Sequence, residues 1–399
     1  MDKLEDLKIA AKEADRCVAC GLCLPSCPTY RKTGSEADSP RGRIQLINAV
    51  AQGRLEVNDK FHQHIDLCLT CRTCENVCPN GVGYGKLIDA ARATIARPPG
   101  LMQRIGNWML RSHRRIAFTG RLLRFSQWIG LRTLVSHMPH ARPVHHVLPV
   151  IPPQTAWQHF YPAQHPKGEV ALFLGCASAV ADPITLRAAI FVLTRLGYSV
   201  HIPPEQGCCG GIARQQGDAS SSRKMLAQNA EAFATCGKMP IVTVASGCGM
   251  GLHDHIGPQV TDIAAFLASC DWSELQPNPL NAAVHVHDAC SLRNVMRQHK
   301  PVYDLLNKIS QADIQPLPGN DQCCGGAGSY VLTQPDMAKQ LLDDKISACQ
   351  TSSARLLVTS NIGCALHIAA GLRDAGMPVE VIHPVHLIAR QLGFEENKA

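Results

Sequence analysis

The sequence of 399 residues predicts a multidomain protein, in which a helical N-terminal domain precedes two similar α/β domains. Two features of the cysteine pattern carry this prediction. Two cysteine runs lie within residues 17–79, and each has the spacing C-x2-C-x2-C-x3-C-P. After residue 168, single and paired cysteines recur in the same order, offset by 114 to 116 residues. We therefore expect domains at 1–95, 169–281 and 282–399, with a basic amphipathic segment and a Pro- and His-rich linker at 96–168.

The two N-terminal runs have the spacing with which bacterial-type ferredoxins hold [4Fe–4S] clusters. Two residues between cysteines let three sulfur atoms converge on one cubane from a tight turn, and the fourth cysteine of each run serves the other cluster. The predicted ligand sets are Cys17, Cys20, Cys23 and Cys78 for the first cluster, and Cys68, Cys71, Cys74 and Cys27 for the second. A zinc ribbon would show two C-x-x-C pairs instead. The pattern thus favours two cubanes over zinc or a disulfide knot.

The connection between the two runs is predicted to be helical. Ser39 is a good N-cap, Pro40 suits the first helical position, and apolar residues follow at helical spacing. A minimal ferredoxin has a short β-rich connection here, so the sequence predicts a helical variant. The glycine-rich stretch 81–86 follows Cys78 and Pro79 and not a strand, so we assign it no nucleotide role.

The segment 96–168 combines basic and large apolar residues. Its arginines include Arg104, Arg111, Arg114, Arg115, Arg121 and Arg124. They alternate with tryptophan, phenylalanine, leucine and isoleucine, and a Pro- and His-rich stretch follows at 139–166. Three interpretations stay open: a helix on an anionic membrane surface, a docking face for a partner, or an ordinary amphipathic helix packed on its own protein.

Each α/β repeat offers four cysteines as possible ligands. They are Cys176, Cys208, Cys209 and Cys248 in the first repeat, and Cys290, Cys323, Cys324 and Cys364 in the second. We expect strands near 170–174, 241–244 and 356–358, with the cysteines at their C-terminal ends, where open α/β sheets place ligands. A further iron–sulfur cluster or a zinc ion in each repeat is the favoured interpretation, ahead of a redox-active dithiol or buried packing thiols. Cys236, Cys270 and Cys349 fall outside the pattern and are interpreted as structural thiols.

Composition narrows the function further. No uninterrupted apolar stretch reaches the length of a membrane span, and the N-terminus mixes charges, which a secretory signal does not. Without an export signal, 19 cysteines indicate a reducing, cytoplasmic setting. No strand is followed by a dinucleotide fingerprint, so we expect neither a flavin nor a catalytic residue in this chain. The net charge of +7 is too diffuse to predict nucleic-acid binding.

Several motifs resemble those of glycolate oxidase (glycolate dehydrogenase) iron–sulfur subunits, which carry two cysteine-rich CCG domains. The motifs are CPTY at 27–30, SPRGRI at 39–44, CLTCRTC at 68–74, SGCG at 246–249 and NIGC at 361–364. The resemblance implies flavoprotein partner subunits that oxidise glycolate to glyoxylate, with flavin in the partners only. It also implies electron transfer to a quinone or another acceptor, and a peripheral position on the inner face of the cytoplasmic membrane.

Related families share the same parts and define the alternatives. They include subunits of glycerol-3-phosphate and lactate dehydrogenase complexes, and heterodisulfide reductases. CCG domains of the reductases end in C-x-x-C and use five cysteines for noncubane clusters. Here the last of those positions is Gly251 in one repeat and His367 in the other. This departure argues against noncubane clusters and against disulfide reduction.

Overall fold

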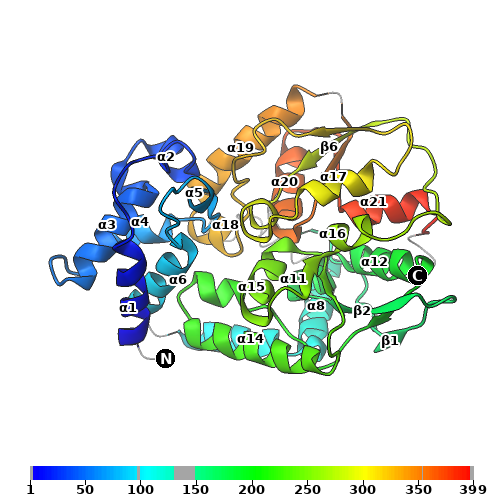
Figure 1. Ribbon diagram of the computed structural model, residues 1–399, viewed down its shortest axis with the longest axis horizontal. Helices are drawn as coiled ribbons and strands as arrows, with labels where there is room; N and C mark the ends of the chain where they lie inside the picture. The colour runs from blue at the N-terminus through cyan, green and yellow to red at the C-terminus, as the bar shows by residue number, and fades with distance from the viewer. Residues whose placement is uncertain (1–2, 97–98, 130–148, 353, 396–399) are drawn as a thin grey trace.

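The computed structural model describes residues 3–96, 99–129, 149–352 and 354–395 (Figure 1). The N-terminal domain is built from helices around the two cysteine loops, as the sequence predicts. These are α1 (Lys3–Ala14), α2 (Pro28–Thr33), the 3-10 turn η1 (Glu36–Asp38), α3 (Pro40–Ala51), α4 (Asp59–Asp66), α5 (Thr73–Asn76) and α6 (Tyr84–Ile95). The connection between the runs is confirmed as helical.

Capping and apolar burial explain this helical domain. Helix α3 begins as expected, because Pro40 is its first residue and the Ser39 hydroxyl accepts a hydrogen bond from the Gly42 amide at 2.9 Å. Ile47, Leu87 and Ile88 are almost completely buried in one cluster between α1, α3 and α6. This core fixes the helices from which the cysteine loops project.

Both repeats contain a parallel sheet with the same strand order. The first runs β3-β2-β4-β5, with β2 (Gly168–Phe173), β3 (Tyr198–His201), β4 (Ile241–Thr243) and β5 (Val260–Asp262). The second runs β7-β6-β8-β9, with β6 (Ala283–His287), β7 (Asp313–Pro316), β8 (Leu356–Thr359) and β9 (Glu380–Ile382). The predicted strands and the duplicated α/β fold are therefore confirmed. A short strand β1 (Phe160–Tyr161), from the segment expected as linker, pairs antiparallel with β3.

Helices connect the strands and cover the sheets. In the first repeat they are α11 (Cys176–Ala181), α12 (Pro183–Arg195), α13 (Gly211–Gln215), α14 (Ala219–Ala234), α15 (Ser246–Ile256) and α16 (Ile263–Ala268). In the second they are the π-helical turn η3 (Ser291–Met296), α17 (Lys300–Leu306), α18 (Tyr330–Thr333), α19 (Pro335–Gln350), α20 (Ile362–Asp374) and α21 (Pro384–Gln391). Helix α21 packs on α12 and α16, so one apolar core joins both repeats.

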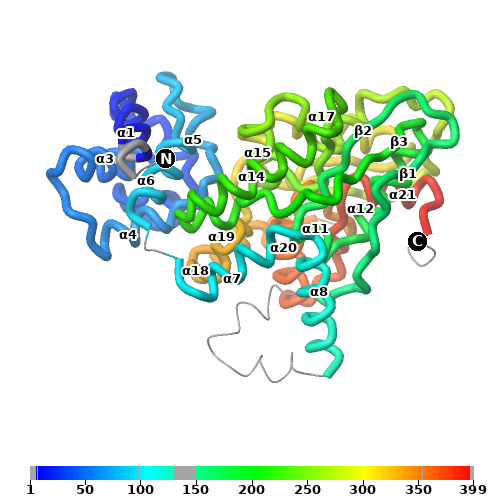
Figure 2. Tube along the Cα trace, turned by 90° about the horizontal axis from the view of Figure 1, so that it is seen from below, coloured from blue at the N-terminus to red at the C-terminus, as the bar shows by residue number. Residues whose placement is uncertain are grey.

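Two helices from the basic segment, α7 (Leu101–Leu110) and α8 (His113–Trp128), lie against the first repeat. The Cys208 amide donates to the Leu110 carbonyl at 2.9 Å, and α8 contacts α11. Figure 2 shows the end of α8 projecting from the body of the molecule. Residues 130–148, which include part of the expected Pro- and His-rich stretch, lie outside the described residues. Within the described part of the chain, no helix has the length and apolar character to cross a membrane.

Candidate metal centres

Two small cavities in the N-terminal domain collect the eight cysteines of the paired runs. The first is lined by Cys17, Cys20, Cys23, Cys74 and Cys78. The second is lined by Cys27, Cys68, Cys71 and Cys74. The fourth cysteine of each run thus lies with the first three of the other run, and Cys74 borders both cavities. Four soft sulfur donors around one small cavity suit an iron–sulfur cubane.

The two runs form the same backbone turn. Ala19 and Thr70, each just before the second cysteine of its run, have φ of 55° and 53°. Gly21 and Arg72, each just after that cysteine, have φ of 84° and 58°. Left-handed conformations are uncommon for residues other than glycine. Three such residues at matched positions therefore indicate a strained backbone conformation of the kind found at functional sites. Here they turn the cysteines of each run toward its cavity.

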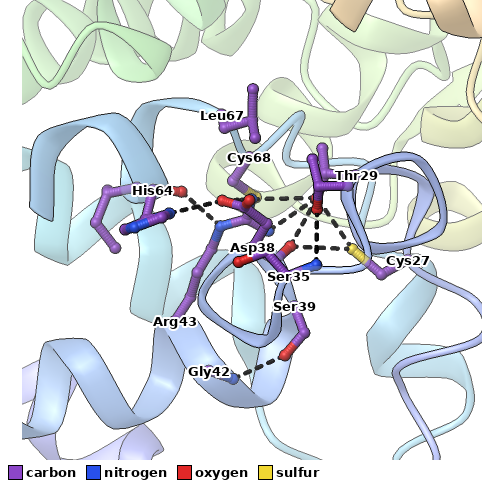
Figure 3. A network of polar contacts seen from close by, with 12 residues as sticks. Cys27, Thr29, Ser35, Asp38, Ser39, Gly42, Arg43, His64, Leu67 and Cys68 are labelled. Carbon is purple, nitrogen blue, oxygen red and sulfur yellow. Dashed lines mark hydrogen bonds and ion pairs between the residues drawn. The ribbon is translucent and has the colours of Figure 1, made fainter. Parts of the chain in front are cut away.

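A buried polar network surrounds Cys27 (Figure 3). The Arg43 side chain is 1% exposed and donates to the Thr29 hydroxyl at 3.1 Å and to the His64 carbonyl at 2.6 Å. Its guanidinium lies 3.8 Å from the Asp38 carboxylate, which in turn contacts His64 Nδ1 at 2.8 Å. The Thr29 hydroxyl lies 3.3 Å from Cys27 Sγ. The network therefore places a fixed positive charge beside the second cavity, which Arg43 itself lines.

Burial makes these thiols poor acids on their own. It raises the pKa of Cys23 to about 11, and it raises the pKa of Cys71 and Cys74 as well. Crowded buried thiolates need a compensating positive charge. A metal ion or cluster supplies that charge, so the donor set fits the predicted cofactor.

The cysteines of the repeats face one cavity of about 460 Å³. It is lined by all eight predicted cysteines, namely Cys176, Cys208, Cys209, Cys248, Cys290, Cys323, Cys324 and Cys364. Within the sets, Cys176 Sγ lies 3.4 Å from Cys208 Sγ, and Cys290 Sγ lies 3.9 Å from Cys323 Sγ. Sequence offsets predicted two separate sites, but they did not reveal that both open into the same space.

The two sets differ in their acid–base character. Hydrogen bonds from the thiols of Cys208 and Cys248 lower the pKa of Cys209 well below its usual value. In the second repeat, the hydrogen bond to Cys323 and burial raise the pKa of Cys290. Within the first set, Cys209 is therefore the thiol that ionises most readily, whereas the pKa of Cys208 and of Cys248 is raised.

The second cysteine run is packed directly against the second repeat. Asn294 Nδ2 donates to the Cys71 carbonyl and to the Thr73 hydroxyl, both at 2.9 Å. The Tyr330 hydroxyl donates to the Leu67 carbonyl at 2.8 Å. Leu69 is buried in a cluster that also contains Cys323, and it lines the shared cavity. The second cysteine run and the repeat cysteines thus meet through buried apolar contacts.

Sequence reasoning missed two residues at these sites. Arg43 lies inside the SPRGRI motif, but nothing in the sequence showed that its side chain turns inward. His287 lies with Cys324 and Cys364 in a group whose donor atoms are all within 4.8 Å of one another. The only sign of this residue in the sequence is its position in the second repeat, which corresponds to that of Phe173 in the first.

The three cysteines outside the repeat pattern lie within apolar clusters. Cys236 and Cys349 are buried, and Cys270 is partly buried.

The glycine-rich stretch after Cys78 has backbone donors that are already occupied. The Gly83 amide donates to the Glu13 carboxylate at 2.8 Å, and the Gly85 amide donates to Glu75 at 2.6 Å. A phosphate-binding loop leaves such amides for the ligand. The structure therefore gives this stretch a role in joining α1, α5 and α6.

Comparison with known proteins agrees with this architecture. Residues 13–82 match the model of a 4Fe-4S dicluster domain, and residues 170–253 and 284–369 each match that of a cysteine-rich domain. The chain is 34% identical to the probable glycolate oxidase iron-sulfur subunit of Bacillus subtilis (strain 168), over 96% of this chain and 94% of that one. It is 33% identical to the glycolate oxidase iron-sulfur subunit of Escherichia coli (strain K12), over 96% and 97%. A chain of the dihydromethanophenazine:CoB–CoM heterodisulfide reductase of Methanosarcina barkeri (strain Fusaro / DSM 804) is 23% identical over 96% and 95%.

Fold and donor sets define an iron–sulfur protein with one dicluster ferredoxin domain and two cysteine-rich domains. Because two relatives exceed 30% identity over nearly their full length, the family can be stated. The chain belongs to the family of glycolate oxidase iron–sulfur subunits. This confirms the family and the fold class that the sequence motifs predicted.

Proposed function

We propose that this chain is the electron-transfer subunit of a flavin-dependent glycolate dehydrogenase complex. In this proposal, flavoprotein partner subunits oxidise glycolate to glyoxylate, and the chain passes the two electrons toward a quinone or another acceptor. The observation that carries it is the pair of adjacent cavities with crossed cysteine sets. The full-length similarity to glycolate oxidase iron-sulfur subunits supports the choice of substrate.

The proposed ligand sets are those of the sequence analysis. Cys17, Cys20, Cys23 and Cys78 hold one [4Fe–4S] cluster, and Cys68, Cys71, Cys74 and Cys27 hold the other. When bound, such clusters accept and release one electron at a time. The chain itself holds the thiolates, excludes water and sets the local charge. Arg43 stabilises negative charge at the second set, and the Tyr84 ring lines both cavities.

Substrate oxidation is assigned to partner subunits. Removing a hydride or a carbon-bound proton from glycolate is chemistry for a flavin, which clusters do not replace. The amides of Gly83 and Gly85 are both engaged by glutamate side chains and do not meet a nucleotide phosphate. We therefore place flavin in the partners only and propose no catalytic residue in this chain.

The repeats are proposed to bind metal in at least one half, as a further iron–sulfur cluster or a zinc ion. Support comes from the crowding of four sulfur donors in each repeat beside a shared cavity. The packing of Leu69 against Cys323 places the second repeat next to the second cysteine run. A thiol–disulfide enzyme related to heterodisulfide reductases is the alternative, and it is favoured by the lowered pKa of Cys209.

We also propose that α7 and α8 rest on an anionic membrane surface. Trp108, Phe125 and Trp128 are more than half exposed on these helices, which is unusual for large apolar side chains on a surface without a partner. Arg114 and Arg121 are exposed on the same helical segment. Apolar side chains that insert and cations that meet lipid headgroups are the features of a peripheral membrane helix.

Anaerobic purification of the intact complex, followed by iron, sulfide and EPR analysis, tests the central proposal. We expect about eight iron atoms in the two N-terminal clusters and EPR signals that appear on addition of glycolate. Glycerol 3-phosphate and lactate serve as competing substrates. If lactate reduces the clusters and glycolate leaves them oxidised, the chain would be assigned to a lactate dehydrogenase complex. Disulfide reduction that is lost in Cys209→Ser would instead support the thiol–disulfide enzyme.

A further inference from the structure

The two repeats differ at the end of their first strand. His287 ends β6 in the second repeat, and Phe173 ends β2 at the matching place in the first. Each stands beside a threonine of the neighbouring strand, Thr359 and Thr243 respectively. The same position is therefore polar in one repeat and apolar in the other.

The two positions also differ in the contacts that surround them. In the second repeat, His287 Nδ1 lies 3.0 Å from the Thr359 hydroxyl. In the first, the Thr243 hydroxyl is buried and has no hydrogen-bond partner among the described residues. Phe173 packs instead against Phe233, with ring centroids 6.2 Å apart. At this position, the second repeat thus offers a ring nitrogen to the cysteine site and the first repeat does not.

A nitrogen of His287 lies close to two sulfurs. His287 is 2% exposed, and its Nε2 has no hydrogen-bond partner in the described part of the chain. One donor atom of the ring and the sulfurs of Cys324 and Cys364 all lie within 4.8 Å of one another. Ligand atoms of a tetrahedral ion with bonds of about 2.0–2.3 Å are roughly 3.3–3.8 Å apart. A small contraction would bring all three donors onto one ion.

Close backbone packing creates this arrangement. A Cβ at Gly326, just after the cysteine pair, would lie 2.8 Å from the Gly363 carbonyl. A Cβ at Gly363 would likewise lie 2.8 Å from the Gly326 carbonyl. Because both residues are glycine, the loop after β7 approaches the start of α20 closely enough to bring the sulfurs of Cys324 and Cys364 near each other.

We propose that the second repeat binds one divalent cation of the zinc type through His287 Nε2, Cys324 Sγ and Cys364 Sγ. The inference deepens the metal-binding role proposed above for the repeats and rests on it. Thr359 holds the ring by accepting from Nδ1–H, which leaves the Nε2 lone pair for the metal. Cys324 and Cys364 line the shared cavity, so a fourth ligand can approach from that side.

Charge balance favours a divalent ion. Binding releases one proton from each of the two thiols, and the two thiolates with a neutral imidazole then offset the charge of the cation. A buried site with no net charge avoids the large cost of an unpaired ion. Two sulfurs and one imidazole nitrogen are donors that zinc takes readily.

X-ray absorption at the zinc edge of the full-length wild-type protein tests the proposal, and the iron of the N-terminal clusters does not interfere. We expect one zinc per chain with two sulfur ligands at about 2.3 Å and a nitrogen ligand at about 2.0–2.1 Å. A shell made only of sulfur, or iron with no zinc in the protein, would overturn the assignment.

Variants provide a second test of the zinc site. His287→Phe, which copies the first repeat, and Cys364→Ser should each lose the zinc, while His287→Cys should keep it with three sulfur ligands. Cys248→Ser is the matched control in the first repeat and should retain zinc. Zinc retained in His287→Phe, or lost equally in Cys248→Ser, would contradict the proposal. Iron content and cluster EPR signals report separately on the N-terminal domain, so failure here would leave the proposed electron-transfer function standing.

Discussion

Arg43 donates two hydrogen bonds of 3.1 Å to the hydroxyl of Thr29, and that hydroxyl lies 3.3 Å from the sulfur of Cys27. A buried cation therefore acts on a proposed cluster ligand through one intervening side chain. Cys27 is the ligand that the crossed pattern gives to the second cluster, so this contact connects the charge of α3 to the cluster beside the second repeat.

Arg43→Gln should lower the reduction potential of the second cluster. Reduction adds negative charge, and the variant removes the nearby positive charge that stabilises it. We expect a decrease on the order of 50–100 mV, equivalent to about 1–2 kcal/mol for one electron. EPR-monitored redox titration of the purified protein measures it. Arg43→Lys should keep most of the wild-type potential, and Arg54→Gln, an exposed arginine on the loop after α3, should keep all of it. Equal potentials in Arg43→Gln and wild type would rule out this electrostatic role.

The crossed ligand sets predict which cluster each variant damages. Cys78→Ser should give the EPR spectrum of Cys20→Ser, because both belong to the first cavity. Cys27→Ser should match Cys71→Ser, because both belong to the second. Each variant should lose about half of the N-terminal iron. The reverse pairing, in which Cys78→Ser resembles Cys71→Ser, would show that each run holds its own cluster.

Charge reversal on α8 should weaken membrane binding. The triple variant Arg114→Glu, Arg121→Glu and Arg124→Glu replaces attraction to anionic headgroups with repulsion, at about 1 kcal/mol for each basic residue. We expect co-sedimentation with phosphatidylglycerol-containing vesicles to fall at least tenfold. High salt should weaken wild-type binding, because exposed charges are screened beyond about 8–10 Å.

The matched control for this test reverses the charge of three exposed lysines elsewhere, by replacing Lys60, Lys238 and Lys300 with glutamate. It has the same net charge as the α8 variant and should still bind the vesicles. Equal loss in both variants would mean that only overall charge matters. Trp128→Ser tests the apolar contribution, because this side chain is 81% exposed and should insert between lipids.

Asp262 should make stability depend on pH. Burial raises the pKa of Asp262 to about 7 from its usual 3.8, although one carboxylate oxygen caps α16 by accepting from the Ala264 amide at 2.9 Å. Because the folded pKa is raised, the protonated acid contributes stability that is complete below about pH 4 and is lost as pH rises through 7. Asp262→Asn keeps the cap acceptor without the charge. Its apparent unfolding temperature should exceed that of wild type at pH 8 and approach it at pH 5.

Asp271→Asn is the control of opposite sign. Hydrogen bonds from the backbone and hydroxyl of Ser273 lower the pKa of Asp271, so its charged form is the stabilising one. This variant should therefore bring no gain at pH 8. A pH-independent difference between wild type and Asp262→Asn would show that the carboxyl does not titrate in this range.

The sequence determined the parts of this protein that depend on local spacing. Ser39 and Pro40 start a helix because an N-cap and a fixed φ act within one turn. The strand ending near residue 173 follows from a short apolar run, and the repeat offset relates it to the segment that ends near residue 287. The paired cysteine runs, with their three-plus-one spacing, predicted the crossed sets that line the two cavities.

Apart from the crossed cysteine sets, only the tertiary structure decided which distant residues meet. Arg43 turns inward because Thr29, Asp38 and the His64 carbonyl, up to 21 residues away, offer it acceptors in one buried place. Both sets of repeat cysteines share a cavity because one core joins the two sheets. His287 reaches Cys324 and Cys364 because strand ends and two glycines converge. Such contacts depend on packing between segments far apart in the chain, which local periodicity does not encode.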